Sequence, residues 1–299
     1  MKQQIKSSLI LLLTATIWGV AFVAQSVGME YIGPFTFNAI RCVLGGLVLI
    51  PVILLLNRKK EAGAETGAKE NKRILWTGGI ACGVILCIAS NLQQFGIMEA
   101  SVGKSGFFTA LYIVMIPVIG IFIGKRPGIK LWFCVALAVV GMYLLCMKDG
   151  SFTIERADIM LLLCALAFSF HILVVDYFSP KVDGVKMSCI QFFVCGVLSA
   201  VGMLFTETPD ISNIQAAWLP LLYAGLLSCG VGYTLQIVGQ KGINPVIASL
   251  IMSLESVISA LAGWVILGQV LSPKEILGCV LMFVAIIITQ IPIGNKKTD

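Results

Sequence analysis

The stretch ASVGKSGFFTAL, residues 100–111, aligns without gaps on NPVIASLIMSLE, residues 244–255, in the second half of the chain. A second gapless alignment places LLLTATIWGVAF, residues 11–22, over LLLCALAFSFHI, residues 161–172. Identity is low, so the spacing and the position within each half carry the comparison. The sequence therefore predicts an internal repeat. Its paired residues are Trp18 with Phe168, Val102 with Val246, Ser105 with Ser249, and Gly124 with Gly268.

Within the first stretch, Gly103-Lys104-Ser105 has the form of the end of a phosphate-binding loop. Such a loop needs glycine or alanine five residues before the Gly-Lys pair, so that backbone amides can curve around phosphate. Met98 stands at that position, and the counterpart NPVIASLI contains no lysine. We therefore interpret the stretch as the start of a membrane span, with Lys104 at the outer mouth of a cavity.

The composition is that of a polytopic membrane protein. Hydrophobic residues make up 58% of the 299 residues, charged residues only 12%, and the mean hydropathy is +0.97. Soluble globular chains contain about 25% charged residues. A membrane span takes about 20 apolar residues, and runs of that kind recur along the whole chain. The predicted spans are residues 8–27, 34–56, 74–95, 102–124, 130–147, 157–176, 185–205, 216–238, 244–267 and 273–291.

Ten spans in two copies give a repeat of five, at residues 8–147 and 157–291. Because five is odd, the second copy begins on the opposite side of the membrane from the first. The predicted fold is therefore an all-α integral membrane protein with ten transmembrane helices in two inverted five-helix repeats. Inverted repeats of this kind give many secondary transporters two conformations of similar energy.

The distribution of charge predicts the orientation. With the amino terminus placed in the cytoplasm, sixteen Lys and Arg residues lie on the cytoplasmic side and four on the outer side. An excess of positive charge in cytoplasmic loops is the usual rule. We therefore expect a protein of the cytoplasmic membrane with both termini in the cytoplasm. The one extended hydrophilic stretch, residues 57–73, is predicted to be a cytoplasmic linker.

Cysteine and histidine give no pattern typical of a metal site. All ten cysteines fall inside apolar segments without a CxxC pair, and His171 is the single histidine. Such cysteines behave as small buried apolar residues. The sequence therefore predicts no metal and no cofactor.

Several motifs carry a resemblance to a known family. They are LLTATIWGVAFV at 12–23, Pro34 followed by Arg41, SxxxSLES at 249–256 and LGQVLSP at 267–273. With these motifs the chain, over residues 8–291, resembles the ten-helix EamA-like members of the drug/metabolite transporter superfamily. The resemblance implies transport of small metabolites, amino acids or drugs through a central cavity. Ser256 and Gln269 depart from the proline and glutamate that are frequent in that family, which weakens the transfer of detail to these positions.

Arg41, Glu255 and His171 lie well inside predicted spans, where charge is costly and usually faces a cavity or a partner. For Arg41 the alternatives are a clamp for a substrate carboxylate and a structural arginine that snorkels or pairs with Glu30 or Glu99. Glu255 must be protonated, paired with Arg41 or another donor, or exposed to a wet cavity. It is a candidate for proton coupling, with a packing role as the alternative. His171 is a second candidate for proton coupling or a buried structural residue.

Polar and aromatic residues complete the predicted cavity. Amides in the third span cannot all face lipid, because hydrocarbon leaves them without hydrogen-bond partners. Aromatic side chains form the expected walls, with packing or lipid contact as the alternative. The candidate polar lining is Asn91, Gln94, Tyr233 and Gln236, and the candidate aromatic walls are Trp18, Phe22, Tyr112 and Trp264.

We expect a secondary active transporter that moves a small metabolite, such as an amino acid, an amine or a drug, by alternating access, with export as the expected direction. Its expected partners are that substrate, protons as a coupling ion, and the lipid bilayer, and the protein is expected to be a monomer or a homodimer. Nothing predicts nucleic-acid binding. A channel or lipid-scramblase-like pathway is the alternative. An enzyme is disfavoured, because HExxH, GxSxG and paired aspartates are lacking.

Overall fold

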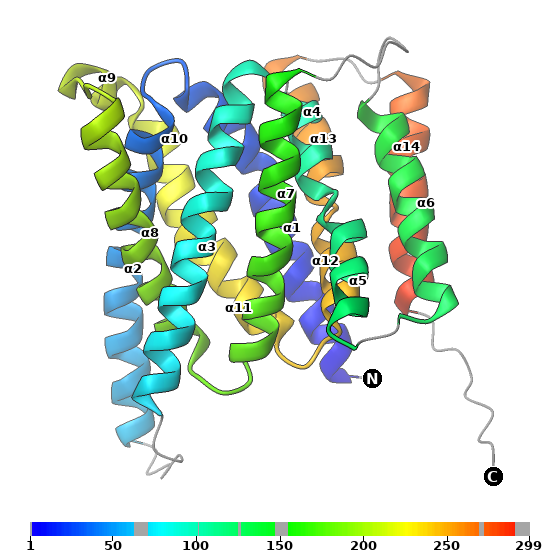
Figure 1. The fold of residues 1–299 in the computed structure, drawn as a ribbon, viewed down its shortest axis with the longest axis horizontal. Helices are drawn as coiled ribbons and strands as arrows, with labels where there is room; N and C mark the ends of the chain where they lie inside the picture. Colours follow the sequence, from blue (N-terminus) through cyan, green and yellow to red (C-terminus); the bar gives the residue numbers. More distant parts are fainter. Residues whose placement is uncertain are drawn as a thin grey trace.

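The computed structural model describes residues 2–62, 71–100, 102–124, 127–146, 155–268 and 272–290. Within these ranges the secondary structure is entirely helical (Figure 1). The elements are α1 Lys2–Gly28, α2 Pro34–Ala62, α3 Lys72–Glu99, α4 Val102–Ala110, α5 Tyr112–Phe122, α6 Ile129–Cys146, α7 Arg156–Phe178, α8 Gly184–Thr206, α9 Ile211–Ala216, α10 Trp218–Leu222, η1 Tyr223–Tyr233, α11 Thr234–Gln240, α12 Pro245–Met252, α13 Glu255–Leu267 and α14 Pro273–Gln290.

Eight helical segments of the described ranges are long and apolar enough to cross a membrane. They match the first four and the sixth to ninth predicted spans. The fifth and tenth predicted spans correspond to α6 and α14, which have 18 residues each and are shorter than the other eight. The structure therefore supports eight of the ten predicted crossings, and the remaining two stay a prediction.

Several helices begin or end where the sequence supplies a cap. Asn71 accepts hydrogen bonds from two backbone amides at the start of α3, and Asp183 does the same for α8. Asn244 caps α12, whose first residue is Pro245. These side chains satisfy amides that have no partner inside the helix. Much of the linker predicted at 57–73, and Gln269, lie outside the described residues.

The ninth predicted span, expected as one helix over 244–267, is instead broken between α12 and α13. The hydroxyl groups of Ser249, Ser253 and Ser256 each donate to the carbonyl three residues earlier, at 2.9, 2.8 and 2.7 Å. Serine side chains that bond to the nearby backbone compete with the helical ladder. The fourth span is also interrupted, at Leu111 between α4 and α5, where the hydrogen bonds of Leu111 are between backbone groups.

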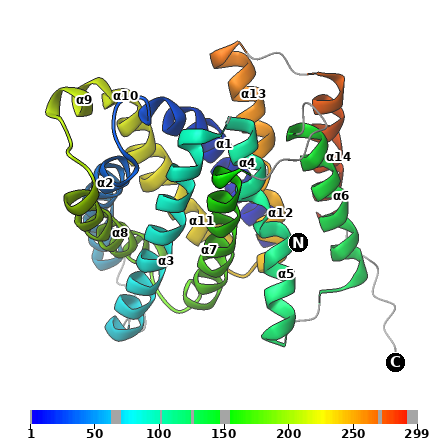
Figure 2. The same cartoon turned by 45° about the horizontal axis from the view of Figure 1, so that its top comes forward.

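The helices of the two halves interleave. Helix α1 packs against η1, α11, α12 and α13, while α3 packs against α7 and α8. Helices α2 and α8 pack together at one edge of the bundle, and α6 and α14 at the opposite edge (Figures 1 and 2). The core therefore lies between the halves, and the space where a site can form is bounded by both.

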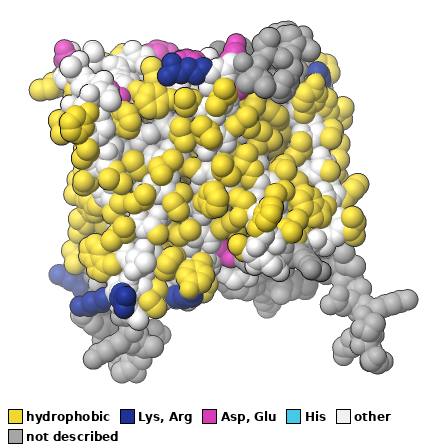
Figure 3. Space-filling view, viewed as in Figure 1, with side chains coloured by type: hydrophobic (Ala, Val, Ile, Leu, Met, Phe, Trp, Pro, Cys, Tyr) yellow, Lys and Arg dark blue, Asp and Glu magenta, His cyan; other side chains and the backbone are white. Residues whose placement is uncertain are grey.

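The surface has the pattern that a bilayer requires. Apolar side chains cover the middle of the visible face, and Lys, Arg, Asp and Glu lie near its upper and lower rims (Figure 3). Large apolar side chains such as Phe133, Leu204 and Phe205 are exposed on the surface. Together with the eight long apolar helices, this pattern is that of a multi-pass membrane protein.

Candidate functional site

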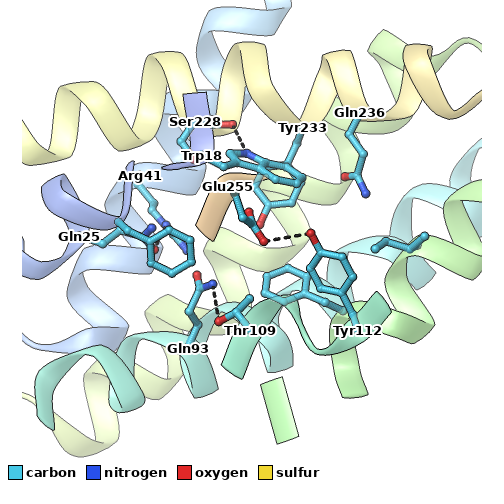
Figure 4. A pocket seen from close by; sticks show the side chains of 13 residues that line it. Trp18, Gln25, Arg41, Gln93, Thr109, Tyr112, Ser228, Tyr233, Gln236 and Glu255 are labelled. Atoms are coloured by element: carbon cyan, nitrogen blue, oxygen red, sulfur yellow. Dashed lines mark hydrogen bonds between the residues drawn. The ribbon is translucent and has the colours of Figure 1, made fainter. Parts of the chain in front are cut away.

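A narrow cavity lies between the two halves (Figure 4). The centre of a water molecule fits into about 30 Å³ of it, which is room for one or two waters. A metabolite therefore needs the walls to move apart. The lining residues are Trp18, Phe22, Gln25, Arg41, Gln93, Thr109, Tyr112, Phe168, Ile172, Ser228, Tyr233, Gln236 and Glu255.

Arg41 supplies a guanidinium group to one side of the cavity. Its Nη1 atom donates to Oε1 of Gln25 at 2.7 Å, and its Cζ atom lies 5.6 Å from the ring centre of Phe37. The side chain is buried, and Nε has no hydrogen-bond partner among the described residues. No ion pair of Arg41 with Glu30 or Glu99, the expected alternative, is present among the described residues, and the acceptor of Nη1 is the amide of Gln25 in α1.

Glu255 supplies a carboxyl group at the first residue of α13. The hydroxyl of Tyr112, the first residue of α5, donates to its Oε1 atom at 3.0 Å. Both side chains are buried. Among the described residues the partner of Glu255 is therefore this tyrosine rather than Arg41. The contact joins the two interrupted spans, one from each half, at the cavity wall.

Aromatic rings form another wall, which includes Trp18, a predicted wall residue, and Tyr233, which was predicted as part of the polar lining. Their ring centres lie 4.6 Å apart, and the indole Nε1 of Trp18 donates to the carbonyl of Ser228 at 3.4 Å. Ser228 belongs to η1, a π-helical segment, and such segments are frequent at functional sites. Aromatic faces of this kind suit apolar or cationic parts of a ligand.

Four predicted cavity residues lie elsewhere. Asn91 bonds to Asn38 and Ser199 between α2, α3 and α8. His171 lies 3.1 Å from Gln191, and Gln94 is fully buried away from the cavity. Trp264 is half exposed on the outer surface of α13. Successive residues of a helix point about 100° apart. A span can therefore be predicted correctly while the face that it turns toward the cavity is predicted wrongly.

Six lining residues were missed, and two of them had a signal in the sequence. Phe168 and Ile172 are the counterparts of Trp18 and Phe22 in the alignment of 11–22 on 161–172. Pairing each candidate with its counterpart would have found both. The other missed residues, for which rotation is decisive, are Gln25, Gln93, Thr109 and Ser228.

Comparison with known proteins agrees with this architecture. The "EamA-like transporter family" model matches residues 5–147 and 155–291. An "Uncharacterized transporter" of Archaeoglobus fulgidus is 27% identical over 94% of this chain and 84% of its own. The "Uncharacterized transporter YwfM" of Bacillus subtilis is 24% identical over 97% of this chain and 96% of its own.

A solved structure described as "Crystal structure of protein" shares the fold. It has a TM-score of 0.76 and 17% identity, and the match covers 95% of this chain and 96% of that one. The family and the names of the relatives indicate a transporter rather than an enzyme. Because the family model matches both halves, the chain belongs to the EamA-like transporter family.

Proposed function

We propose that the protein is a secondary active transporter of the cytoplasmic membrane that exports a small metabolite by alternating access. The observation that carries this proposal is the buried polar and aromatic cavity between the halves, with counterpart residues of both halves in its wall. Trp18 and Phe168 face it from one pair, and Phe22 and Ile172 from another. A site at the interface of inverted repeats is the usual position for a substrate in such carriers.

Matching contacts between the halves support the inverted repeat. In the alignment of the first spans, counterparts lie 150 positions apart. Gly46 lies against the ring of Phe193. The counterpart of Gly46 is Gly196, and the counterpart of Phe193 is Val43. Gly196 in turn lies against Val43. Two helices related by a twofold axis produce such a pair of equivalent contacts. The contacts across the α2–α8 interface therefore support the proposed repeat.

A one-residue difference between the third and eighth spans supports the same arrangement. The matching contacts are Gly83 with Val194 and Gly225 with Leu44 near one end, and Gly96 with Leu161 and Gly239 with Leu11 near the other. The glycines of the first set lie 142 positions apart and those of the second set 143. The eighth span thus has one extra residue, and the wider turns of η1 lie between these contacts.

The chemistry of the cavity suits a small zwitterion or amine. The guanidinium of Arg41 can bind a carboxylate through two parallel hydrogen bonds. The carboxyl of Glu255 can accept from an ammonium group, and the adjoining rings of Tyr112 and Tyr233 attract cations. Because a proton and an ammonium group compete for one carboxyl, Glu255 is also our candidate for proton coupling. His171 lies outside the cavity wall and is dropped from that role.

Transport by the purified protein in liposomes tests the function. A panel of amino acids and amines should include a substrate with saturable uptake and counterflow, in which unlabelled substrate on one side drives labelled substrate in from the other. Inside-out and right-side-out vesicles should differ in the direction of proton-driven accumulation, with export from the cytoplasmic side. Flux that does not saturate would indicate a channel, and movement of labelled lipid would indicate a scramblase.

A further inference from the structure

An ion pair joins the two halves at the outer end of the bundle. The Nζ atom of Lys104, in α4, lies 2.8 Å from Oε2 of Glu155 and 3.0 Å from Oδ1 of Asp158, at the start of α7. Asp158 is almost fully buried and Lys104 is about one quarter exposed. The backbone amide of Glu155 also donates to Asp158, which fixes the acidic side chain in place. We call these three residues the outer latch.

The outer latch lies above the cavity on two of the helices that line it. Thr109 follows Lys104 by five residues of α4, and Phe168 follows Asp158 by ten residues of α7. At 1.5 Å per residue these are distances of about 7 and 15 Å along the helices. A buried apolar cluster lies at the same end. Its members are Phe22, Val23, Ile97, Val102 and Ala262.

The opposite end of the cavity has no equivalent of the outer latch at the counterpart positions. By the repeat alignments, Lys104 corresponds to Ala248, Glu155 to Ile5 and Asp158 to Ser8, so the charged side chains are replaced by neutral ones. Ala248 is fully buried. A second hollow, with about 210 Å³ of space for the centre of a water molecule, lies at that end. It is lined by Ile116, Pro117, Gly120, Pro127, Leu173, Asn244, Pro245 and Val246.

We propose that the outer latch holds the outer mouth of the cavity closed, so that opening outward costs more than opening toward the cytoplasm. Separation of α4 from α7 would leave Asp158 without its cation. A conformation in which a buried charge has lost its partner is strongly disfavoured. Water that enters the opened mouth would stabilise the charge of Asp158 only in part. The proposal rests on the proposed function in assuming that the halves move apart. In this proposal Lys104, the lysine of Gly103-Lys104-Ser105, has a role in gating and does not bind a nucleotide.

Hydrogen–deuterium exchange on the full chain in lipid nanodiscs tests the outer latch. In Lys104→Met, peptides that cover 100–111 and 155–166 should exchange at least about tenfold faster than in the wild type, because exchange there follows opening. Lys104→Arg keeps the charge and should exchange at the wild-type rate. Glu155→Gln retains Asp158 and should give an intermediate rate. Arg156→Gln, which removes a positive charge next to the latch, is the matched control and should exchange like the wild type.

Equal exchange in Lys104→Met and the wild type would overturn the proposal. If Lys104→Met does not fold, the comparison of Glu155→Gln with the wild type decides the matter, since this variant removes only the exposed partner. The transport assay separates this proposal from the proposed function. Saturable transport with unaltered exchange in the variants refutes the latch alone, whereas faster exchange without any saturable transport retains the latch and refutes the carrier.

Discussion

At the scale of single residues, the cavity places a guanidinium and a carboxyl group on different helices and gives each a neutral partner. Gln25 holds Arg41, and Tyr112 holds Glu255. A neutral partner leaves the charge of a group available to a ligand. An ion pair between Arg41 and Glu255 would instead have neutralised both charges. In the proposed transporter, Arg41 and Glu255 would therefore bind groups of opposite charge separately.

Replacement of Arg41 by lysine should weaken transport of substrates that carry a carboxylate. Lysine keeps the charge but loses the planar fork, and a hydrogen bond to a charged group contributes about 1.5–3 kcal/mol. We expect the KM for an amino-acid substrate to rise at least about tenfold, and that for the matching amine without a carboxylate to stay the same. Arg58→Lys, at the exposed end of α2, is the control. Equal effects on both substrates would contradict a carboxylate clamp.

Replacement of Glu255 by glutamine should separate transport from its driving force. Glutamine has a similar shape and can still accept from Tyr112, but it does not gain or lose a proton. A pH gradient should no longer drive accumulation in Glu255→Gln liposomes, while counterflow without a gradient should persist. Tyr112→Phe keeps the carboxyl group and should retain coupling. Accumulation at the wild-type level in Glu255→Gln would exclude Glu255 as the coupling site.

At the scale of the elements, close packing of helices depends on glycine. A Cβ atom built on Gly83 would lie 2.6 Å from Cβ of Val194 and 2.8 Å from the carbonyl of Gln191, so the helices would have to separate. Gly83→Ala should lower stability by about 1–3 kcal/mol, the usual cost of overpacking. Gly103, with no atom within 4 Å of the added Cβ, is the matched control. Melting temperatures in detergent measure both, and equal values would contradict the packing argument.

The extra residue of the eighth span makes a second prediction at this scale. Deletion of Gly230 from η1 should leave a folded protein, because the third span makes the matching contacts with one residue fewer. The carbonyl of Ser228 should then no longer reach Trp18, and transport should be lost. The third span contains no extra residue, so deletion of Ile88 from α3 should unfold the protein. Melting temperature and size-exclusion profile distinguish the two, and equal damage by both deletions would contradict the assignment of the extra residue.

At the scale of the whole molecule, the distribution of charge predicts the orientation in the membrane. The first residue of α1 and the last described residue of α14 lie on the same side of the bundle (Figure 1). A chain with both termini in the cytoplasm requires this arrangement. A fluorescent protein fused after Asp299 should therefore fluoresce in cells, and alkaline phosphatase inserted at residues 208–209, between α8 and α9, should be active outside. Active phosphatase at the carboxyl terminus would contradict the predicted orientation.

Much of the architecture was accessible from the sequence. Composition identified the membrane class, apolar runs located the spans, and the motifs identified the family. Seven of the eleven predicted cavity residues line the cavity. The membrane class and the approximate positions of eight spans could be predicted because hydrocarbon requires apolar surfaces and internally satisfied backbone, and both requirements leave a regular pattern in the chain.

Other properties depended on the tertiary structure. The spans broken at Leu111 and at Ser253 both read as continuous apolar runs, and in the ninth span serine hydroxyls bond to the backbone in a way that hydropathy does not report. The choice of Gln93 over Gln94 for the cavity follows from the rotation of α3 against its neighbours. The ion pair of Lys104 with Glu155 and Asp158 joins residues about 50 positions apart. The sequence alone determined the membrane class, the approximate spans and the family, because those depend on local polarity. Only packing between the halves decided which side chains share the cavity and which form the ion pair beyond it.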